Sequence, residues 1–241
     1  MKIDYDALNY LRCIIYPNRC IFCGEIMPPD RNICDSCNEN LPWIRGEVCC
    51  ECGSQKEDCQ CGKRHGSYYD GVASVFYYRD GVRDCIHRFK FQGDRYAYKE
   101  LGSLMAKCLS ERFGETEFDF IAYVPMEKKR RRKRGYNQSE LLARRIAEES
   151  GIPLGENLIE KIYKTNVQHE CDMLERKGNL LGAFEINPSF SVKGKTILLV
   201  DDIRTSGATL SECGKMLYLN GADKVLCLTA ATVNSTIKDT V

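Results

Sequence analysis

The sequence lacks several features that mark large classes of proteins. No stretch of the 241 residues approaches the roughly 18 uninterrupted apolar residues that a membrane-spanning helix needs, so we expect no membrane insertion. The amino-terminal stretch carries acidic side chains and no basic head before a long apolar run, so we expect a cytoplasmic protein without a secretory signal. The formal net charge is only +1, which argues against a protein that coats nucleic acid over its whole surface.

The chain also lacks a low-complexity linker and a long internal repeat, but its composition changes near residue 66. Ten of the 15 cysteines fall before residue 62, in a stretch rich in Pro, Asn and Asp. After residue 67, apolar strands alternate with helical patterns, which is typical of a mostly parallel sheet flanked by helices. The sequence therefore predicts a small cysteine-rich domain over 1–66 and an α/β domain over 67–241.

Paired cysteines predict a metal site early in the first domain. Many cysteines in a cytoplasmic protein favour metal binding over disulfides. Two Cys-x-x-Cys pairs can place four thiolates around one zinc ion at about 2.3 Å per bond. These ligands are Cys20, Cys23, Cys34 and Cys37. Because four thiolates leave no open coordination position, we expect this zinc ion to be structural.

A second set of cysteines predicts a second zinc ion. Its ligands are Cys49, Cys52, Cys59 and Cys61, with Cys50 as a spare or alternative ligand. His65 could replace a cysteine, although a solvent-facing histidine is the simpler interpretation. Since some 60 residues with few large apolar side chains cannot build a sufficient core, zinc binding supplies folding free energy to this domain.

Two adjacent carboxylates follow a buried strand in "KTILLVDDIRTSGATLSECGKMLYLNGA". Ile197 to Val200 form a continuous apolar run, as in a strand that is buried on both faces. Asp201 and Asp202 come directly after it, at the strand end where open α/β sheets bind ligands. We expect both carboxylates at an exposed strand end, where they can accept hydrogen bonds from a pair of sugar hydroxyls or bind a hydrated magnesium ion.

A turn rich in hydroxyl groups leads from these acids into a helix. Backbone N–H groups at the helix start, joined by the hydroxyls of Thr205, Ser206 and Thr209, suit a phosphate group. Gly207 allows the backbone to approach that phosphate. The lysine of a nucleoside-triphosphatase loop is missing, so that class is excluded. The helix that follows has its buried side at Leu210, Cys213 and Leu217 and ends near Asn220 and Gly221.

Seven consecutive basic residues, in "EKKRRRKRGYNQS", lie between another strand and helix. The strand is predicted over 118–124, ending at Pro125, and the helix begins after Asn137 as its N-cap and stops at Gly151. We therefore interpret the basic run as a strand-to-helix loop on the same sheet edge as the paired acids. It suits either nucleic acid or a highly phosphorylated small molecule.

These segments together resemble a known family. "VDDIRTSGAT" resembles the phosphoribosyl pyrophosphate (PRPP) signature of type I phosphoribosyltransferases. With the cysteine pairs in front and "VPMEKKRRRKRGYNQSELLA" between, the chain resembles the ComF family, which joins a zinc ribbon to a phosphoribosyltransferase domain. The resemblance implies a type I phosphoribosyltransferase fold in which Asp201 and Asp202 contact the ribose. The phosphate would be bound by Thr205, Ser206, Gly207, Ala208 and Thr209.

The resemblance also divides the basic run. It implies that Arg134, and more loosely Arg130, face the pyrophosphate and its magnesium ion, beside Pro125, Tyr136, Asn137 and Gln138. The other cations, Lys128, Lys129, Arg131, Arg132 and Lys133, would form a solvated face or a nucleic-acid contact. Arg204 departs from the family pattern, where an uncharged residue is frequent, so no role follows for it.

Two further segments match the family. "NVQHECDMLERKGNLLGAFEI" corresponds to a loop that closes over PRPP, in which Arg176 would reach a phosphate; Gln168, Leu174, Asn179 and Phe184 also match. His169 is a weaker candidate for a general base. "HRFKFQGD" lies in the segment expected to receive the second substrate, where Lys90 would touch a ligand or Phe89 and Phe91 would simply pack.

The sequence therefore predicts a PRPP-binding, phosphoribosyltransferase-like protein with two structural zinc ions and magnesium bound with PRPP. If it transfers phosphoribosyl to an acceptor and releases pyrophosphate, the residues that carry the reaction are Asp201, Asp202, Arg134 and Arg130. The alternative is a single-stranded-DNA-binding accessory protein of DNA uptake that uses the pocket as a PRPP sensor, with competence or DNA-processing proteins as partners. The sequence names no acceptor.

Overall fold

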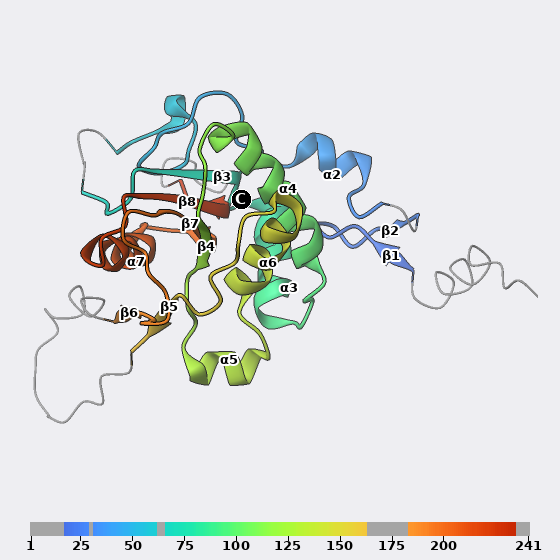
Figure 1. The fold of residues 1–241 in the computed structure, drawn as a ribbon. Helices are drawn as coiled ribbons and strands as arrows, with labels where there is room; N and C mark the ends of the chain where they lie inside the picture. The colour runs from blue at the N-terminus through green and yellow to red at the C-terminus, as the bar shows by residue number, and fades with distance from the viewer. Residues whose placement is uncertain (1–16, 29–30, 62–65, 163–182, 235–241) are drawn as a thin grey trace, which may run out of the picture.

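A four-stranded parallel sheet forms the centre of the protein, in the order β3-β8-β7-β4 (Figure 1). The computed structural model describes residues 17–28, 31–61, 66–162 and 183–234. The strands are β3 (Gly71–Tyr77), β8 (Lys224–Thr232), β7 (Thr196–Arg204) and β4 (Phe120–Tyr123). All three neighbouring pairs run parallel, which confirms the fold class predicted from the alternation of strands and helices.

Helices cover both faces of this sheet (Figure 1). One face packs against α3 (Asp80–Phe91), α4 (Ala97–Phe113) and α6 (Gln138–Ser150), and the other against α7 (Ala208–Leu219). In β7, Leu198 and Val200 enter the first core, whereas Ile197 and Leu199 enter the second, as the period of two residues in a strand requires. The three predicted apolar positions of α7 are all buried.

The strand that carries the paired acids is longer than its apolar run suggests. The sequence predicts its end at Val200, but β7 continues to Arg204 because β8 stays paired beside it as far as Thr232. On the other side, β4 ends at Tyr123, which is the partner of Val200. The two acids therefore lie past the end of β4 but inside the ladder between β7 and β8.

The basic run forms a helix, so the prediction of a loop was wrong. The helix α5 (Lys128–Arg134) starts after Glu127, ends at Gly135 with φ 87°, and lies at the lower end of the molecule in Figure 1. Lysine and arginine are good helix formers, and the left-handed glycine provides the stop. The following helix α6 is as predicted: the Asn137 side chain accepts a hydrogen bond from the Ser139 N–H, and Gly151 ends the helix.

The cysteine-rich segment packs onto the edge strand β3. Its regular elements are short: β1 (Asn18–Arg19), β2 (Ile26–Met27), α2 (Asp35–Asn40) and the 3-10 turn η1 (Lys56–Asp58). The amide of Ile44 donates to the carbonyl of Val75 at 3.0 Å, and that of Val72 donates to the carbonyl of Cys50 at 2.9 Å. The segment thus covers backbone groups that an edge strand would otherwise expose. Phe22 enters the same core as α3 and α4.

Two short strands, β5 (Ile159–Lys161) and β6 (Phe184–Ile186), form a separate antiparallel pair. Phe184 is buried there. The other residues predicted for the closing loop, Arg176 with Gln168, His169, Leu174 and Asn179, lie outside the described residues. Within the part of the chain that is described, no helix is both long and apolar enough to cross a membrane.

Candidate functional site

Eight cysteines gather into two clusters whose members are those predicted. The first cluster contains Cys20, Cys23, Cys34 and Cys37, and the second contains Cys49, Cys52, Cys59 and Cys61. Within each cluster all sulfur atoms lie within 4.8 Å of one another. Cys50, the spare candidate, is exposed and belongs to neither cluster.

The spacing of the sulfur atoms fits a tetrahedral zinc ion. Four thiolates at about 2.3 Å from one ion place neighbouring sulfurs about 3.8 Å apart. The distance between the Cys23 and Cys34 sulfurs is 3.7 Å, and so is that between the Cys52 and Cys59 sulfurs. Both clusters therefore suit a structural zinc ion, which would be held by four thiolates and would tie together a segment with little regular structure.

The paired carboxylates are covered rather than exposed, so that expectation was wrong. Asp202 is 7% exposed, and its Oδ1 lies 2.8 Å from the ammonium of Lys90 on α3. Asp201 accepts a hydrogen bond from the Ser139 hydroxyl at 2.7 Å, at the start of α6. Because β4 has already ended, α3 and the first turn of α6 close over this end of β7. The half-buried ammonium of Lys90 thus places a cation against the Asp202 carboxylate.

Burial changes the ionisation of Asp201. Removal from water, together with the negative charge of the neighbouring Asp202, raises the pKa of this carboxyl from 3.8 to about 7. Hydrogen bonds from Ser139 and from the Asp202 amide act in the opposite direction. A cation that binds beside Asp201 near neutral pH would therefore favour release of the carboxyl proton.

A turn over 205–207 connects these acids to α7. Gly207 has φ +79°, a left-handed conformation that favours glycine, and it is the N-cap of α7. Gly207 has no side chain that could cap the helix, and the Ala208 amide donates to the Ser206 hydroxyl at 3.4 Å. Thr205, Ser206 and Ala208 are exposed, and Thr209 is half-buried. The first amides of α7 and three hydroxyls thus lie together at a surface that suits an anion.

A cavity with four cationic side chains is connected to Asp202 through Lys90. The cavity measures about 600 Å³, and its lining residues are Lys90, Phe91, Gly93, Arg130, Lys133 and Arg134. Lys90 joins the two features, because it lines this cationic cavity and pairs with Asp202. The structure therefore brings the predicted Arg130 and Arg134 together and adds Lys133, which was predicted to belong to a solvated face or a nucleic-acid contact.

Arg134 differs from the other residues of α5 by its burial. It is the only residue of α5 that is not exposed. Its guanidinium donates to the Gln138 side chain at 2.6 Å and lies 5.0 Å from the centre of the Phe91 ring. Burial lowers its pKa, while the negative charge of Asp202 acts to raise it, so the two charges face each other. Phe91 itself is 66% exposed, so the expectation that it packs was wrong; Phe89 is fully buried.

The residues after Arg134 contact the protein itself. The Tyr136 hydroxyl and the Gln138 amide both donate to the Phe89 carbonyl at the end of α3. The Asn137 amide donates to the Val124 carbonyl at 3.0 Å. Pro125, half-buried, follows Val124 directly. These residues fix the cationic cavity against β4 and α3, and their predicted contact with a ligand stays a prediction.

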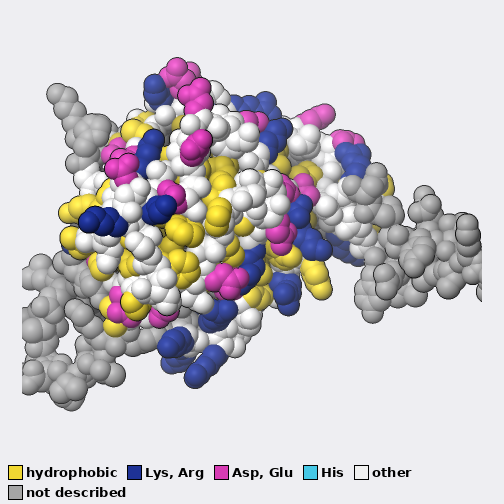
Figure 2. Space-filling model, viewed as in Figure 1, with side chains coloured by type: hydrophobic (Ala, Val, Ile, Leu, Met, Phe, Trp, Pro, Cys, Tyr) yellow, Lys and Arg dark blue, Asp and Glu magenta, His cyan; other side chains and the backbone are white. Residues whose placement is uncertain are grey.

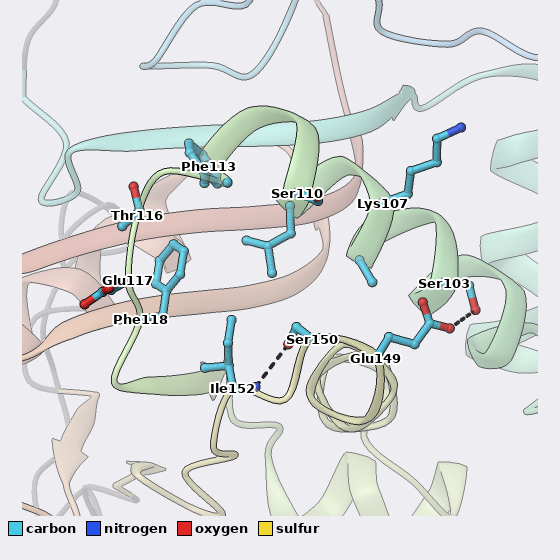
Figure 3. A pocket seen from close by; sticks show the side chains of 13 residues that line it. Ser103, Lys107, Ser110, Phe113, Thr116, Glu117, Phe118, Glu149, Ser150 and Ile152 are labelled. Atoms are coloured by element: carbon cyan, nitrogen blue, oxygen red, sulfur yellow. Dashed lines mark hydrogen bonds between the residues drawn. The ribbon is translucent and has the colours of Figure 1, made fainter.

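A cavity of about 760 Å³ lies apart from all of these residues (Figure 3). It opens between α4 and the carboxyl end of α6, where Ser103 and Glu149 are hydrogen-bonded and Phe113 and Phe118 form the wall. None of the predicted site residues lines it. Its larger volume therefore does not make it the better candidate, because it holds neither the paired acids nor clustered cations.

Sequence reasoning missed the residues that cover the acids. Nothing in the pattern linked Ser139 to Asp201, because that contact joins residues 62 positions apart. Lys90 was considered, but as a ligand contact rather than as the partner of Asp202. Arg204, which carried no expectation, is buried directly before the turn. The contacts of the two acids depend on how α3 and α6 pack, and the periodicity of the sequence does not report this packing.

We predict that the second cysteine cluster binds its zinc ion without Cys50. Cys50→Ser should leave two zinc ions per chain, because this thiol lies outside the cluster. Cys52→Ser should reduce the ratio to one. Elemental analysis of protein purified without added metal measures both ratios. Loss of a zinc ion from Cys50→Ser would contradict the assignment.

The pKa of Asp201 predicts how the stability of the free protein depends on pH. The folded protein holds the proton up to about pH 7, whereas the unfolded chain releases it near 3.8, so the free energy of unfolding falls as the pH rises between these values. Asn cannot ionise. The free energy of unfolding of Asp201→Asn, relative to that of wild type, should therefore increase by about 1–3 kcal/mol between pH 5 and 8, because one pKa unit corresponds to roughly 1.4 kcal/mol.

Chemical denaturation without ligand or magnesium measures this difference. Asp119→Asn is the control, because Lys195 and the Thr196 amide lower the pKa of Asp119. Its carboxylate stabilises the protein above the pKa of the unfolded chain, so that variant should lose stability relative to wild type as the pH rises through that range. An identical pH dependence in wild type and Asp201→Asn would refute a raised pKa.

Comparisons with known proteins agree with this geometry. Residues 11–66 match the double zinc ribbon domain, and residues 100–240 match the phosphoribosyl transferase domain. Competence protein ComFC of Bacillus subtilis is 28% identical over 209 residues, which cover 81% of this chain and 82% of that protein. The DNA utilization protein YhgH of Escherichia coli K12 is 26% identical and is covered to 86%, as is this chain.

Solved structures show similarity over about half of the chain. A purine phosphoribosyltransferase from Pyrococcus horikoshii has 17% identity and a TM-score of 0.37 over 56% of this chain and 83% of its own. The allosteric regulatory enzyme of purine biosynthesis has 23% identity and a TM-score of 0.39 over 55% of this chain but only 25% of its own length. The family match covers more than half of the chain, and the resemblance to ComF is confirmed. The chain belongs to the phosphoribosyl transferase domain family and carries a double zinc ribbon domain in front of it.

Proposed function

We propose that this protein binds PRPP with magnesium at the carboxyl end of β7. The observation that carries the proposal is the pairing of Asp202 with Lys90, which lines the cationic cavity, on a strand that leads directly into the 205–207 turn. A phosphate monoester suits the amides at the start of α7, a sugar diol suits the carboxylates, and a pyrophosphate suits four cations. PRPP contains these three groups in this order.

The donor set also suits a magnesium ion. Magnesium prefers oxygen ligands and binds proteins through one or two carboxylates together with substrate phosphates. Asp202 already faces an ammonium at 2.8 Å, which shows that a positive charge is stable at this oxygen. Asp201 directly precedes Asp202 in the same strand. When bound, the ion would neutralise the charge that develops on the leaving pyrophosphate.

The same arrangement supports transfer of the phosphoribosyl group to an acceptor, with release of pyrophosphate. Such a reaction passes through an oxocarbenium-like state at the anomeric carbon. The carboxylates would orient the ribose hydroxyls, and their negative charge favours the developing cation. Arg134 and Arg130 would stabilise the departing pyrophosphate, since fixed donors act strongly in a partly buried cavity. Support comes from the family match and from the placement of these groups around Asp202.

Binding of PRPP should depend on Arg134 much more than on its exposed neighbours in α5. Arg134→Ala should weaken PRPP binding by about 1.5–3 kcal/mol, the free energy of a charged hydrogen bond. Arg132→Ala is the matched control, because Arg132 is exposed and does not line the cationic cavity. Titration calorimetry with magnesium measures both affinities. An equal loss in the two variants would indicate general attraction by α5 rather than a defined site.

A second function, binding of single-stranded DNA, is favoured by the exposed face of α5. Lys128, Lys129 and Arg132 are exposed and lie outside the cationic cavity, and Figure 2 shows basic side chains clustered at the end of the molecule where α5 lies. Arg131 is excluded from this set because it pairs with Glu140 at 3.0 Å. Relatives that carry the names competence protein and DNA utilization protein support this candidate.

Salt dependence should separate the two functions. Each lysine or arginine that contacts a single-stranded phosphate contributes about 0.7 to the slope of log affinity against log salt. Lys129→Gln with Arg132→Gln should therefore reduce the slope for single-stranded DNA by about 1.4 and leave PRPP affinity unchanged. The control is Lys193→Gln with Lys224→Gln, at the amino-terminal edge of the sheet. Equal slopes in both double variants would contradict a DNA site on α5.

A further inference from the structure

Arg204 is a buried cation without an acidic partner among the described residues. It is the last residue of β7 and is 8% exposed. Its two hydrogen bonds go to neutral groups: Nε donates to the Tyr69 hydroxyl at 3.5 Å, and Nη1 donates to the Thr205 carbonyl at 3.3 Å. Because a buried charge without a counter-ion is costly, a structural role alone gives no reason for arginine here.

The guanidinium of Arg204 lies directly beneath the 205–207 turn. A Cβ atom on Gly207 would be 3.1 Å from both Nε and Nη2 of Arg204, and 3.1 Å from the Tyr69 hydroxyl. Arg204 also lines a cavity of about 590 Å³ together with Thr205 and Ser206. The unpaired charge is therefore placed where an anion held by the turn would lie close to it. In a site of low exposure, such a charge acts more strongly than in water.

Tyr69 connects this pair to the second cysteine cluster. Its hydroxyl donates to the Glu51 carbonyl at 2.8 Å, and Glu51 lies between the ligand candidates Cys49 and Cys52. A second connection runs through the end of β8. There the Thr232 hydroxyl donates to the Cys52 carbonyl at 3.0 Å, while the next amide, of Val233, donates to the Arg204 carbonyl at 2.9 Å. The cluster thus fixes both the side chain and the backbone of Arg204.

We propose that Arg204 is a positioning residue for a phosphate monoester bound at the 205–207 turn, and that the second zinc ribbon holds it in place through Tyr69. The inference rests on the proposed function, because it requires a phosphate at this turn. Arg204 shapes the turn from below and supplies positive charge to its ligand. The ribbon therefore contributes to ligand binding as well as to folding.

Two probes separate this role from general structural damage. Ribose 5-phosphate tests the turn, and pyrophosphate tests the cationic cavity, none of whose lining residues belongs to the turn. Arg204→Met should weaken ribose 5-phosphate binding at least tenfold, and Arg204→Lys should lose less because it keeps the charge. Tyr69→Phe, which removes one hydroxyl, should weaken it about threefold or more. All three should leave pyrophosphate affinity within about twofold and zinc content at the wild-type ratio.

Tyr218→Phe is the matched control. This variant also removes a tyrosine hydroxyl, but that hydroxyl donates to Asp70, which lies directly before β3 and not at the 205–207 turn. It should change neither the affinity for ribose 5-phosphate nor that for pyrophosphate. Calorimetry on the full chain measures all values. If wild type binds ribose 5-phosphate and both Arg204→Met and Tyr69→Phe bind it equally well, this inference is wrong and the proposed function stands. Equal weakening of both probes would also overturn it. If wild type binds neither ribose 5-phosphate nor PRPP, both proposals fail.

Discussion

The ladder between β7 and β8 is the constraint on which the candidate site depends. It continues past the end of β4 and therefore carries Asp201, Asp202 and Arg204 on a rigid backbone while leaving one side of them open to helices. The two adjacent acids have different partners, Ser139 at the start of α6 for Asp201 and Lys90 near the end of α3 for Asp202. Both helices pack on the same face of the sheet, and they cover the acids because β4 ends before this point.

The charged side chains on this ladder differ in whether a partner of opposite charge lies beside them. One acid is paired with an ammonium, the other has a raised pKa, and among the residues that the structure describes the arginine at the end of the strand has no acidic partner. The net charge of the whole chain gives no hint of this, since basic and acidic residues nearly balance. Local burial, and not composition, determines which charges remain available to a ligand. The exposed cations of α5 that lie outside the cationic cavity, Lys128, Lys129 and Arg132, form a separate group from the half-buried Arg134.

Much of this could be read from the sequence, because the signals were local. The two cysteine sets, the apolar run before the acids, the glycine of the 205–207 turn and the cap at Asn137 each depend on neighbours within a few residues. The errors concern what happens between distant segments. The basic run was interpreted as a loop although its composition favours a helix, and the acids were expected to be exposed because the covering residues come from α3 and α6. Arg204 could not be interpreted at all until its contact with Tyr69 was visible.

The packing of the ribbon on β3 has a consequence for the order in which the chain acquires its structure. The inner neighbour of β3 is β8, so Ser74 pairs with Thr229, about as far apart in the sequence as this sheet allows. During synthesis β3 therefore emerges long before the strand that will lie beside it, and unpaired strands of this kind are prone to aggregate. The cysteine-rich segment precedes β3 and covers its outer side through three backbone hydrogen bonds. They join Ile44 to Val75, Cys50 to Val72, and Pro42 to Tyr77. Zinc binding by the nascent chain would thus cover the outer edge of β3 before β8 is synthesised. The cysteine-rich segment would protect the sheet from aggregation during this interval.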